Sequence, residues 1–268
     1  MRLDGVKLLV VGGSAGIGRE LGRAAVEAGA RVAFAARRTH VLDEVTRDSE
    51  RAFAVRLDVC DEGAVASALD ESVTLLGGLD AVVLTAGTAR LGRLADQGAD
   101  EWRAVLETNV MGPALVARAA VPHLTPGVGV MVFCSSTVED QQRWGLSAYG
   151  VSKVALNRLV ECLRAEHEDV RFVRATIGST VGTEFGANFS DDALSEAFAH
   201  WIVRAQHTTQ MMVVEDVSSV LLDLLAMLLE RPGVHMPTVK IEPPGGPLTL
   251  EPTADVVARV FAPRGDAV

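Results

Sequence analysis

The stretch KLLVVGGSAGIGREL, residues 7–21, joins a short apolar run to a glycine-rich turn and then to a helical pattern. In the turn, Gly12, Gly16 and Gly18 have the spacing Gly-x-x-x-Gly-x-Gly. Glycine at such positions lets the backbone turn sharply and approach a phosphate without a Cβ in the way, and the helix N-terminus favours negative charge. The stretch therefore predicts a strand, a phosphate-binding loop and a helix, with a purely structural glycine turn as the alternative.

The same alternation of apolar runs and helical segments continues along the chain. Runs that are apolar throughout are typical of parallel strands covered on both faces, and repeated strand–helix–strand units imply right-handed crossovers. The predicted strands are 7–11, 31–35, 52–59, 79–87, 129–135, 171–177 and 238–242. The predicted helices are 17–28, 61–76, 100–120, 148–167 and 215–229. The fold class is therefore α/β, a doubly wound Rossmann sheet of about seven parallel strands with helices on both faces.

Two later segments depart from this rhythm. Residues 179–214 hold glycines, a polar SDD start and a helical pattern near 191–205, and we expect this insertion over the carboxyl edge of the sheet, where ligands bind in such folds. Residues 243–268 are rich in Pro and Gly, and we expect their apolar stripe to cap the body or a neighbouring subunit. No linker or repeat divides the chain, so we predict one domain over residues 1–268. The stripe comprises Val256, Val257, Val260 and Phe261.

Composition and charge exclude several classes of function. The net charge of −10 argues against nucleic acid, whose phosphates are bound by concentrated Lys and Arg. The first apolar run is too short to span a membrane and lacks a signal-peptide cleavage site, so we expect a cytoplasmic protein. Cys60, Cys134 and Cys162 have no Cys-x-x-Cys spacing and the histidines form no ligand pattern, so neither a disulfide framework nor a metal site is predicted.

The segment SAYGVSK, residues 147–153, contains the only tyrosine of the chain. Tyr149 and Lys153 are four positions apart on a predicted helix, so they share one face. A tyrosine with an ordinary pKa near ~10 needs a neighbouring cation to ionise at neutral pH, and Lys153 provides one. Ser136, thirteen residues before Tyr149, ends a strand and can donate a hydrogen bond to a substrate carbonyl oxygen. The spacing predicts an acid–base site.

Together these motifs resemble the short-chain dehydrogenase/reductase family of the classical type, over residues 5 to about 242. The family's usual forms are Thr-Gly-x-x-x-Gly-Ile-Gly and Ser-x12-Tyr-x3-Lys, and the second selects Ser136 over Ser135. The resemblance implies that Tyr149 gives or takes the proton, that Lys153 lowers its pKa and holds the cofactor ribose, and that Ser136 orients the carbonyl.

The resemblance adds Asn109, inside the predicted helix 100–120, as a fourth catalytic residue. Pro113 has no N–H to donate to the carbonyl of Asn109, so we expect a kinked helix with a free carbonyl there. In the family this carbonyl holds a water that links the lysine to solvent. The alternative is an asparagine that only stabilises the kink.

The resemblance also implies NADP(H), with NAD(H) as the weaker alternative. Arg37 and Arg38 follow the second strand, where an NAD-binding member has an acidic residue at about Ala36, and guanidinium groups suit a 2′-phosphate. One or both arginines, Arg38 more readily, would otherwise solvate the start of a helix. The implied cofactor-binding residues are Gly12, Ser14, Gly16, Ile17, Gly18, Arg37, Arg38, Asp58, Val59, Ala86, Gly87, Tyr149, Lys153 and Thr180.

Several positions depart from the family pattern. Val11 replaces a threonine and removes a hydroxyl that would tie the glycine loop down. The fourth strand ends LTAG where the family has Asn-Asn-Ala-Gly, so Leu84 and Thr85 lose the amides. After the sixth strand, IGSTVGT leaves open whether Thr180 or Thr183 contacts the nicotinamide carboxamide.

Two pairs of acidic residues each allow two interpretations of their role. Asp58 is placed beside the adenine by the resemblance, or it caps the following helix, although Asp61 is the better-placed cap. Glu139 and Asp140 line the substrate mouth, or they belong to a solvated loop.

These motifs predict an oxidoreductase that moves a hydride between NADP(H) and a carbonyl/alcohol pair. The alternatives are a catalytically silent NADP(H)-binding regulator or partner protein, and an NAD-dependent alcohol dehydrogenase of the same family. We expect residues 138–146 and 179–214 to form an apolar substrate pocket. The resemblance also implies a homodimer or homotetramer, formed through helices 100–120 and 148–167.

Overall fold

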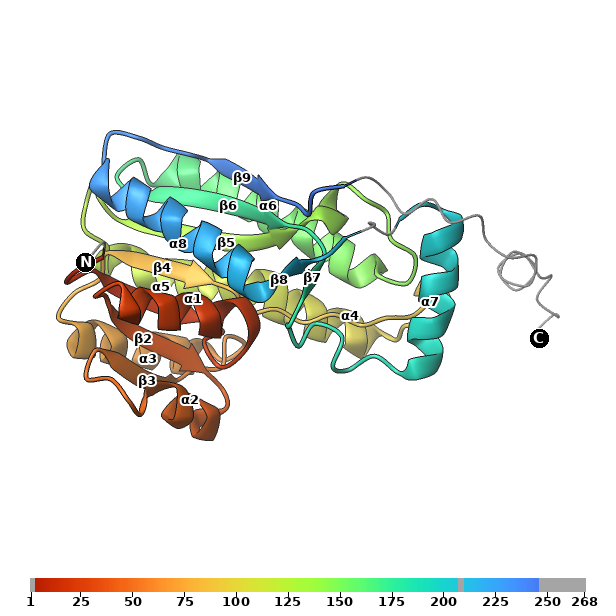
Figure 1. The fold of residues 1–268 in the computed structure, drawn as a ribbon, viewed down its shortest axis with the longest axis horizontal. Helices are drawn as coiled ribbons and strands as arrows, with labels where there is room; N and C mark the ends of the chain where they lie inside the picture. Colours follow the sequence, from red (N-terminus) through yellow and green to blue (C-terminus); the bar gives the residue numbers. More distant parts are fainter. Residues whose placement is uncertain (1–2, 207–209, 246–268) are drawn as a thin grey trace.

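The computed structural model describes residues 3–206 and 210–245 (Figure 1). The apolar stripe predicted near the C-terminus lies outside the described residues.

Seven parallel strands form the central sheet, in the order β3-β2-β1-β4-β5-β6-β9. The strands are β1 Lys7–Val11, β2 Arg31–Ala36, β3 Ala52–Arg56, β4 Ala81–Leu84, β5 Val130–Ser136, β6 Arg171–Ile177 and β9 Thr238–Ile241. The order runs outward from β1 in both directions, which confirms the predicted doubly wound sheet. Predicted strands 52–59 and 79–87 end early because their last residues leave the sheet as loops at its carboxyl edge.

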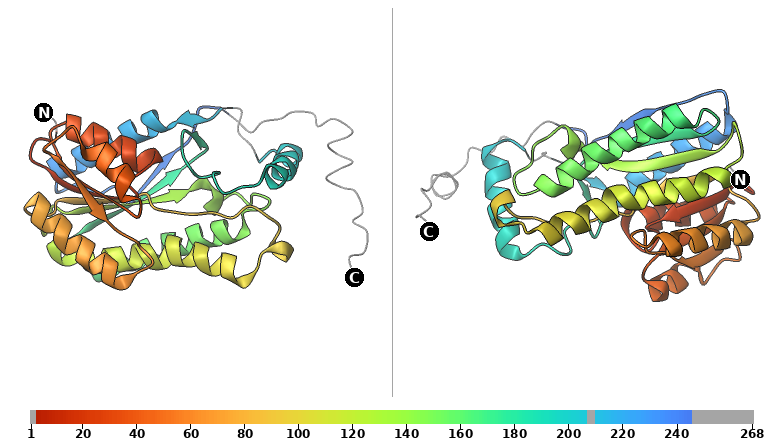
Figure 2. Two further views of the ribbon diagram at one scale, coloured as in Figure 1. Left: turned by 90° about the horizontal axis from the view of Figure 1, so that it is seen from below. Right: turned by 180° about the vertical axis from the view of Figure 1, so that it is seen from behind.

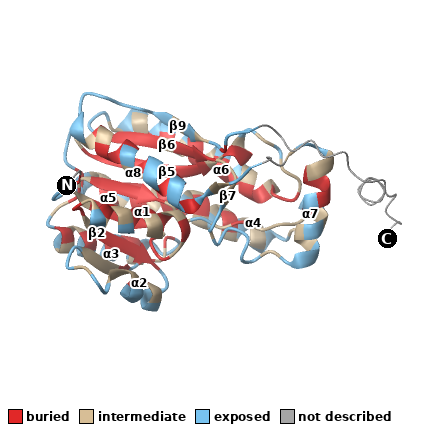
Figure 3. Ribbon diagram, in the orientation of Figure 1, coloured by how far each residue is buried: buried red, intermediate tan, exposed pale blue. Residues whose placement is uncertain are grey.

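Helices cover both faces of this sheet. The helices are α1 Gly16–Glu27, α2 Thr39–Thr46, α3 Glu62–Leu76, α4 Ala99–Leu106, α5 Gly112–Ala120, α6 Ser147–Glu166, α7 Asp191–Val203 and α8 Val214–Glu230. One face packs against α3, α5 and α6, and the other against α1, α2 and α8 (Figure 2). Buried residues are concentrated in the sheet and on the inner helix faces (Figure 3). The sequence analysis missed α2, in which only Leu42 is buried and the apolar signal is therefore weak.

The predicted helix 100–120 is interrupted in the middle. A π-helical turn, Glu107–Met111, separates α4 from α5, and the N–H of Gly112 donates to the carbonyl of Glu107. Asn109 lies in this turn, and Pro113 follows as the second residue of α5. The helix is therefore disturbed where the sequence predicts a kink.

The insertion at 179–214 contains α7 and a small parallel sheet of its own. The two short strands are β7, Thr180–Val181, and β8, Met212–Val213. The hydroxyl of Ser190 accepts a hydrogen bond from the N–H of Ala193 and so caps α7. Figure 1 shows α7 beyond the carboxyl ends of the strands, where the insertion was expected.

Candidate active site

The glycine loop between β1 and α1 has no room for side chains at two positions. Gly12 has a φ of +96°, and a Cβ there would lie 2.7 Å from the backbone nitrogen of Ala86. A Cβ on Gly18 would lie 2.5 Å from the carbonyl oxygen of Gly12. The loop is therefore a bare stretch of backbone at the N-terminus of a helix, which is the arrangement that accepts phosphate groups.

Thr85 supplies the hydroxyl that Val11 lacks. Its Oγ1 donates to the carbonyl of Val11 at 3.0 Å, and the backbone N–H groups of Thr85 and Ala86 donate to the same oxygen. The two departures from the family pattern thus compensate each other, because the loop is tied down from β4 instead of from within β1.

We expect Thr85→Val to lower the free energy of unfolding by about 1–2 kcal/mol, since a methyl group would replace the donor that faces the Val11 carbonyl. Urea unfolding of the variant and the wild type measures this difference. Thr85→Ser is the matched control, because it keeps the hydroxyl and removes only the methyl. A Thr85→Val variant as stable as the wild type would show that the hydroxyl does not stabilise the loop.

Arg38 reaches back to the glycine loop. Its guanidinium donates to Ser14 Oγ at 3.1 Å and to both carboxylate oxygens of Glu184, at 3.0 and 2.7 Å. Although Arg38 is the N-cap residue of α2, its side chain does not extend along that helix start, which was the alternative interpretation. Arg37 is exposed at the same end of β2. A guanidinium group therefore lies beside the loop that would hold a dinucleotide.

The two aspartates after β3 have different tasks. Asp61 Oδ1 accepts the N–H of Ala64 at 2.9 Å, which confirms it as the cap of α3. Asp58 accepts the N–H of Cys60 at 3.1 Å within the turn. Asp58 therefore does not cap α3.

Ser136, Tyr149 and Lys153 come together at the carboxyl end of β5. Ser136 ends the strand, and α6 carries Tyr149 and Lys153, both of which are buried. The Ser136 hydroxyl lies close enough to the Tyr149 phenol to lower its pKa. Lys153 Nζ donates to the carbonyl of Cys134 at 2.9 Å and lies 5.5 Å from the centre of the Tyr149 ring. The sequence spacing thus corresponds to one compact cluster.

Burial dominates the acid–base properties of this cluster. It raises the pKa of Tyr149 to about 12, against the Ser136 hydrogen bond and the charge of Arg143, which both lower it. It lowers the pKa of Lys153 from 10.5 to about 8, against the charges of Cys134 and Glu139, which raise it. The phenol is therefore protonated at neutral pH in this state.

Arg143 is a functional candidate that the sequence analysis missed. It lies within 138–146, a segment predicted to line the pocket, but no motif singles it out. The sequence feature that could have identified Arg143 is that it is the one basic residue between Ser136 and Tyr149.

Asn109 joins three parts of the site through its side chain. Its Nδ2 donates to the carbonyl of Thr88 at 2.8 Å and to Ser152 Oγ at 2.9 Å, and its Oδ1 accepts the Thr88 N–H at 2.8 Å. A Cβ on Gly87 would lie 3.4 Å from Asn109 Oδ1 and 3.8 Å from Lys153 Nζ. Asn109 therefore fixes the loop after β4 against α6, next to the lysine.

Glu139 is held by hydrogen bonds and does not belong to a solvated loop. It follows β5 in a 3-10 turn that directs it back over the strand ends, where it is half-buried. Its carboxylate accepts hydrogen bonds from Ser135 Oγ at 2.8 Å, Thr176 Oγ1 at 3.1 Å and Asn157 Nδ2. Asp140 is exposed. Ser135 is thus occupied by Glu139, which leaves Ser136 as the serine beside the tyrosine.

The two threonines after β6 lie in different surroundings. Thr180 Oγ1 donates to the carbonyl of Gly178 at 3.0 Å, within its own turn. Thr183 lies against the glycine loop, because a Cβ on Gly16 would come within 3.5 Å of it. Thr183, not Thr180, is therefore the threonine beside that loop.

Aromatic rings surround Tyr149 on the side of the insertion. The Phe185 ring is 5.0 Å from the Tyr149 ring, edge to face, and 5.5 Å from the Phe189 ring. Trp201 belongs to the same apolar cluster as Tyr149. Apolar side chains of the insertion therefore pack against Tyr149.

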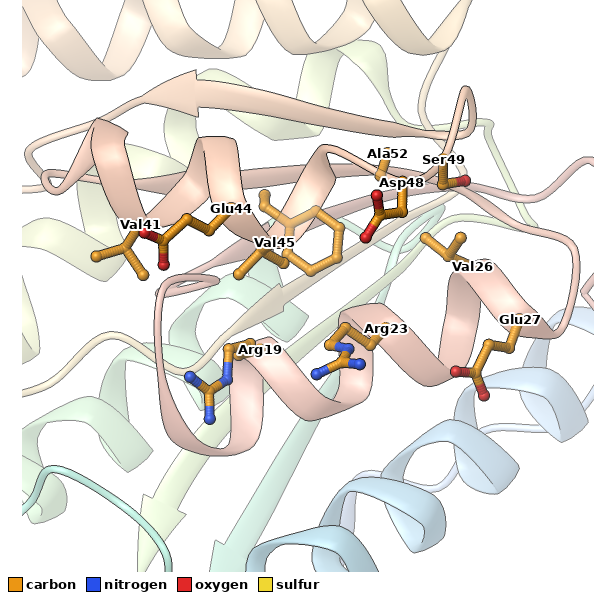
Figure 4. Close-up of a pocket in the computed structure, with 11 residues that line it drawn as sticks. Arg19, Arg23, Val26, Glu27, Val41, Glu44, Val45, Asp48, Ser49 and Ala52 are labelled. Carbon is orange, nitrogen blue, oxygen red and sulfur yellow. The ribbon is translucent and has the colours of Figure 1, made fainter.

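A separate cavity of about 510 Å³ lies between α1 and α2 (Figure 4). Arg19 and Arg23 project from α1, and Glu44 and Asp48 lie across from them. Its charges are of mixed sign, and none of the predicted site residues lines it. We therefore do not consider it the reaction site.

No helix within residues 3–206 and 210–245 is both long and apolar enough to cross a membrane.

Comparison with known proteins agrees with the site. A family profile described as short chain dehydrogenase matches residues 7–193. The chain is 34% identical over 207 residues to a short chain dehydrogenase of Pseudocercospora fijiensis, which covers 74% of this chain and 66% of that relative, just under two thirds of its length. Versicolorin reductase of Emericella nidulans is 30% identical over 218 residues, or 75% of this chain and 82% of that protein.

A solved short chain dehydrogenase of Burkholderia cenocepacia, in complex with NADP, superposes with a TM-score of 0.74 at 27% identity, over 90% of this chain and 98% of the other. The family profile covers well over half of the sequence, and the glycine loop and the Ser136, Tyr149 and Lys153 cluster lie on the elements that it spans. The chain therefore belongs to the short-chain dehydrogenase family.

Proposed function

We propose that this protein is an NADP(H)-dependent oxidoreductase that transfers a hydride between the cofactor and a carbonyl/alcohol substrate. The observation that carries the proposal is the meeting of Ser136, Tyr149 and Lys153 at the sheet edge that also carries the glycine loop. A phenol, an ammonium and a hydroxyl in one buried cluster suit proton transfer to a carbonyl oxygen.

The residues that are present fit a dinucleotide. Gly12 and Gly18 let the loop pack against Thr85 and Ala86 at the N-terminus of α1, where backbone N–H groups favour a phosphate. Arg38 lies beside Ser14 with a guanidinium group suited to a phosphate. When bound, the nicotinamide supplies or accepts the hydride. Binding of NADP to the Burkholderia cenocepacia relative supports the same cofactor here.

In this proposal each residue has one task in reduction. Ser136 donates a hydrogen bond to the substrate carbonyl, which stabilises the negative charge that builds on the oxygen. Tyr149, protonated at neutral pH because its pKa is raised to about 12, gives its proton to that oxygen. Lys153 holds the cofactor ribose, and its ammonium stabilises the phenolate that remains. Asn109 keeps the loop after β4 and the helix of Lys153 in register.

The direct test is a panel of carbonyl compounds incubated with NADPH, in which loss of the reduced cofactor's absorbance reports turnover. We expect turnover of at least one compound, and faster turnover with NADPH than with NADH. A wild-type protein that binds neither cofactor would overturn the proposal, and tighter binding of NADH would overturn the cofactor assignment.

For Arg38→Ala we expect the Kd for NADPH to rise about tenfold and the Kd for NADH to stay within about twofold, because one charge-assisted contact to the 2′-phosphate is lost. Titration of both cofactors by calorimetry measures this. Arg37→Ala is the matched variant, since Arg37 is the neighbouring arginine and, within the described part of the chain, makes no hydrogen bond to the loop. If Arg38→Ala weakens the binding of NADPH and NADH equally, Arg38 holds the loop through Ser14 and does not contact the phosphate.

A further inference from the structure

Arg143 lies in the site with its hydrogen-bonding capacity only partly used. The side chain is half-buried, and its Nη2 donates to Ser179 Oγ at 3.1 Å. Its Nε is fully buried and has no hydrogen-bond partner within residues 3–206 and 210–245. The guanidinium carbon lies 5.9 Å from the centre of the Trp201 ring.

Arg143 also lacks a counterion among the described residues. The chain has 35 acidic residues and a net charge of −10, so a carboxylate partner would be easy to supply. Burial nevertheless lowers the pKa of Arg143, and the one titratable group that opposes this is Tyr149, whose phenol is neutral at neutral pH. A partly desolvated guanidinium with no carboxylate beside it is stabilised when an anion binds.

The segment that carries Arg143 is held firmly against α7. Trp201 Nε1 donates to the carbonyl of Trp144 at 2.9 Å, and the Trp144 ring stacks on His200 at 4.3 Å. The N–H of Trp144 donates to Gln206 Oε1 at 3.3 Å. The guanidinium is therefore positioned before a ligand arrives, which reduces the entropy lost on binding.

The charge of Arg143 acts on the reacting group itself. It lowers the pKa of Tyr149, so the guanidinium and the phenol share one electrostatic environment. The rings of Phe185 and Phe189 lie on the side of Tyr149 that faces the insertion. A substrate whose carbonyl reaches Tyr149 thus meets the guanidinium group and several apolar rings.

We propose that Arg143 binds a carboxylate of the substrate, so that the enzyme acts on oxo acids with an aromatic or apolar body. This inference rests on the proposed function. A guanidinium fork matches a carboxylate in geometry and charge. In reduction, a hydride from NADPH adds to the carbonyl carbon and the Tyr149 proton goes to the oxygen. The products are the hydroxy acid and NADP+, and the carboxylate is unchanged.

The test compares matched pairs, each an aryl oxo acid and its methyl ester, with wild type and Arg143→Met. The measured quantity is the ratio of kcat/KM for acid to kcat/KM for ester. Because any effect of Arg143 on Tyr149 changes both substrates alike, it cancels in the ratio. We expect the wild type to favour the acid and the ratio to fall about 10- to 100-fold in Arg143→Met, as the charge-assisted contact is lost.

Arg143→Lys is the second variant, because it keeps the positive charge but loses the planar guanidinium group that can bind a carboxylate through two hydrogen bonds. We expect it to recover part of the ratio, which a loss of folding would not do. The Kd for NADPH should be unchanged in Arg143→Met, since the anion is assigned to the substrate and not to the cofactor. A ratio that stays the same in Arg143→Met, or weaker NADPH binding in that variant, would overturn the inference.

Binding measured without turnover separates this inference from the proposed function. Trp144 and Trp201 lie beside Arg143, so quenching of tryptophan fluorescence gives a Kd for the acid and for the ester with NADP+ present. Selective binding of the acid, lost in Arg143→Met, would support the carboxylate site even in a protein that turns over no carbonyl. Equal binding of acid and ester by the wild type would reject the carboxylate site and leave the proposed function standing.

Discussion

Tyr149→Phe is expected to lower kcat for NADPH-dependent carbonyl reduction by about 1,000-fold or more, because general acid catalysis by a positioned group contributes about 10²–10⁴-fold. The substitution removes one hydroxyl and keeps the ring, which packs edge to face on Phe185 at 5.0 Å. Steady-state rates with the best substrate of the panel measure the effect.

The Kd for NADPH is the control for this variant, and we expect it to change by less than about threefold, since the ring still occupies its place and Lys153 is untouched. Retention of a large fraction of kcat would remove Tyr149 from the proposed chemistry. Unaltered behaviour in a functional assay that does not depend on turnover would favour an NADP(H)-binding regulator instead.

Lys153→Met is expected to abolish turnover and at the same time to stabilise the fold at neutral pH. The folded-state pKa of Lys153 is about 8, against an ordinary value of 10.5, so below pH 8 the folded protein holds a buried charge that the unfolded chain exposes to water. This pKa difference corresponds to at most about 3 kcal/mol of folding free energy, which the variant would recover. Loss of the hydrogen bond to the Cys134 carbonyl offsets about 1 kcal/mol of that stabilisation.

The lowered pKa of Lys153 determines how the stability difference between variant and wild type changes with pH. Because the pKa is lower in the folded state, the unfolded wild type binds more protons between about pH 8 and 10.5, and wild-type stability rises with pH through that window. Lys153→Met lacks this rise, so its advantage is largest near about pH 7 and shrinks toward about pH 10. Urea unfolding of both proteins at these two pH values measures it. A variant that is less stable than wild type at both would show that the ammonium stabilises the fold.

The sheet was predictable because its signal is local. Each strand is a short apolar run, and the glycine turn after the first run determines where the first helix begins. The helix α2 and the strands β7 and β8 were missed because their apolar runs are short and mostly exposed. The π-helical turn was predicted only as a kink, since Pro113 indicates a lost hydrogen bond and not the geometry that replaces it.

The catalytic cluster was predictable for a different reason. Four positions on a helix and the end of a strand constrain Tyr149, Lys153 and Ser136 once the fold is known. The polar contacts around the cluster were not predictable, because they join residues far apart in the chain. Arg38 meets Glu184 across 146 positions, and the Thr85 hydroxyl reaches the Val11 carbonyl across 74. No spacing rule within one motif can indicate such a pair.

The strand order has a consequence for cooperative unfolding. The glycine loop leaves β1 toward the half of the sheet that contains β2 and β3, whereas Ser136 ends β5 in the other half. A ligand that contacts both the loop and Ser136 binds only when both halves are folded together. Its binding energy then opposes the separate unfolding of either half, so that saturating ligand raises the temperature of a single transition.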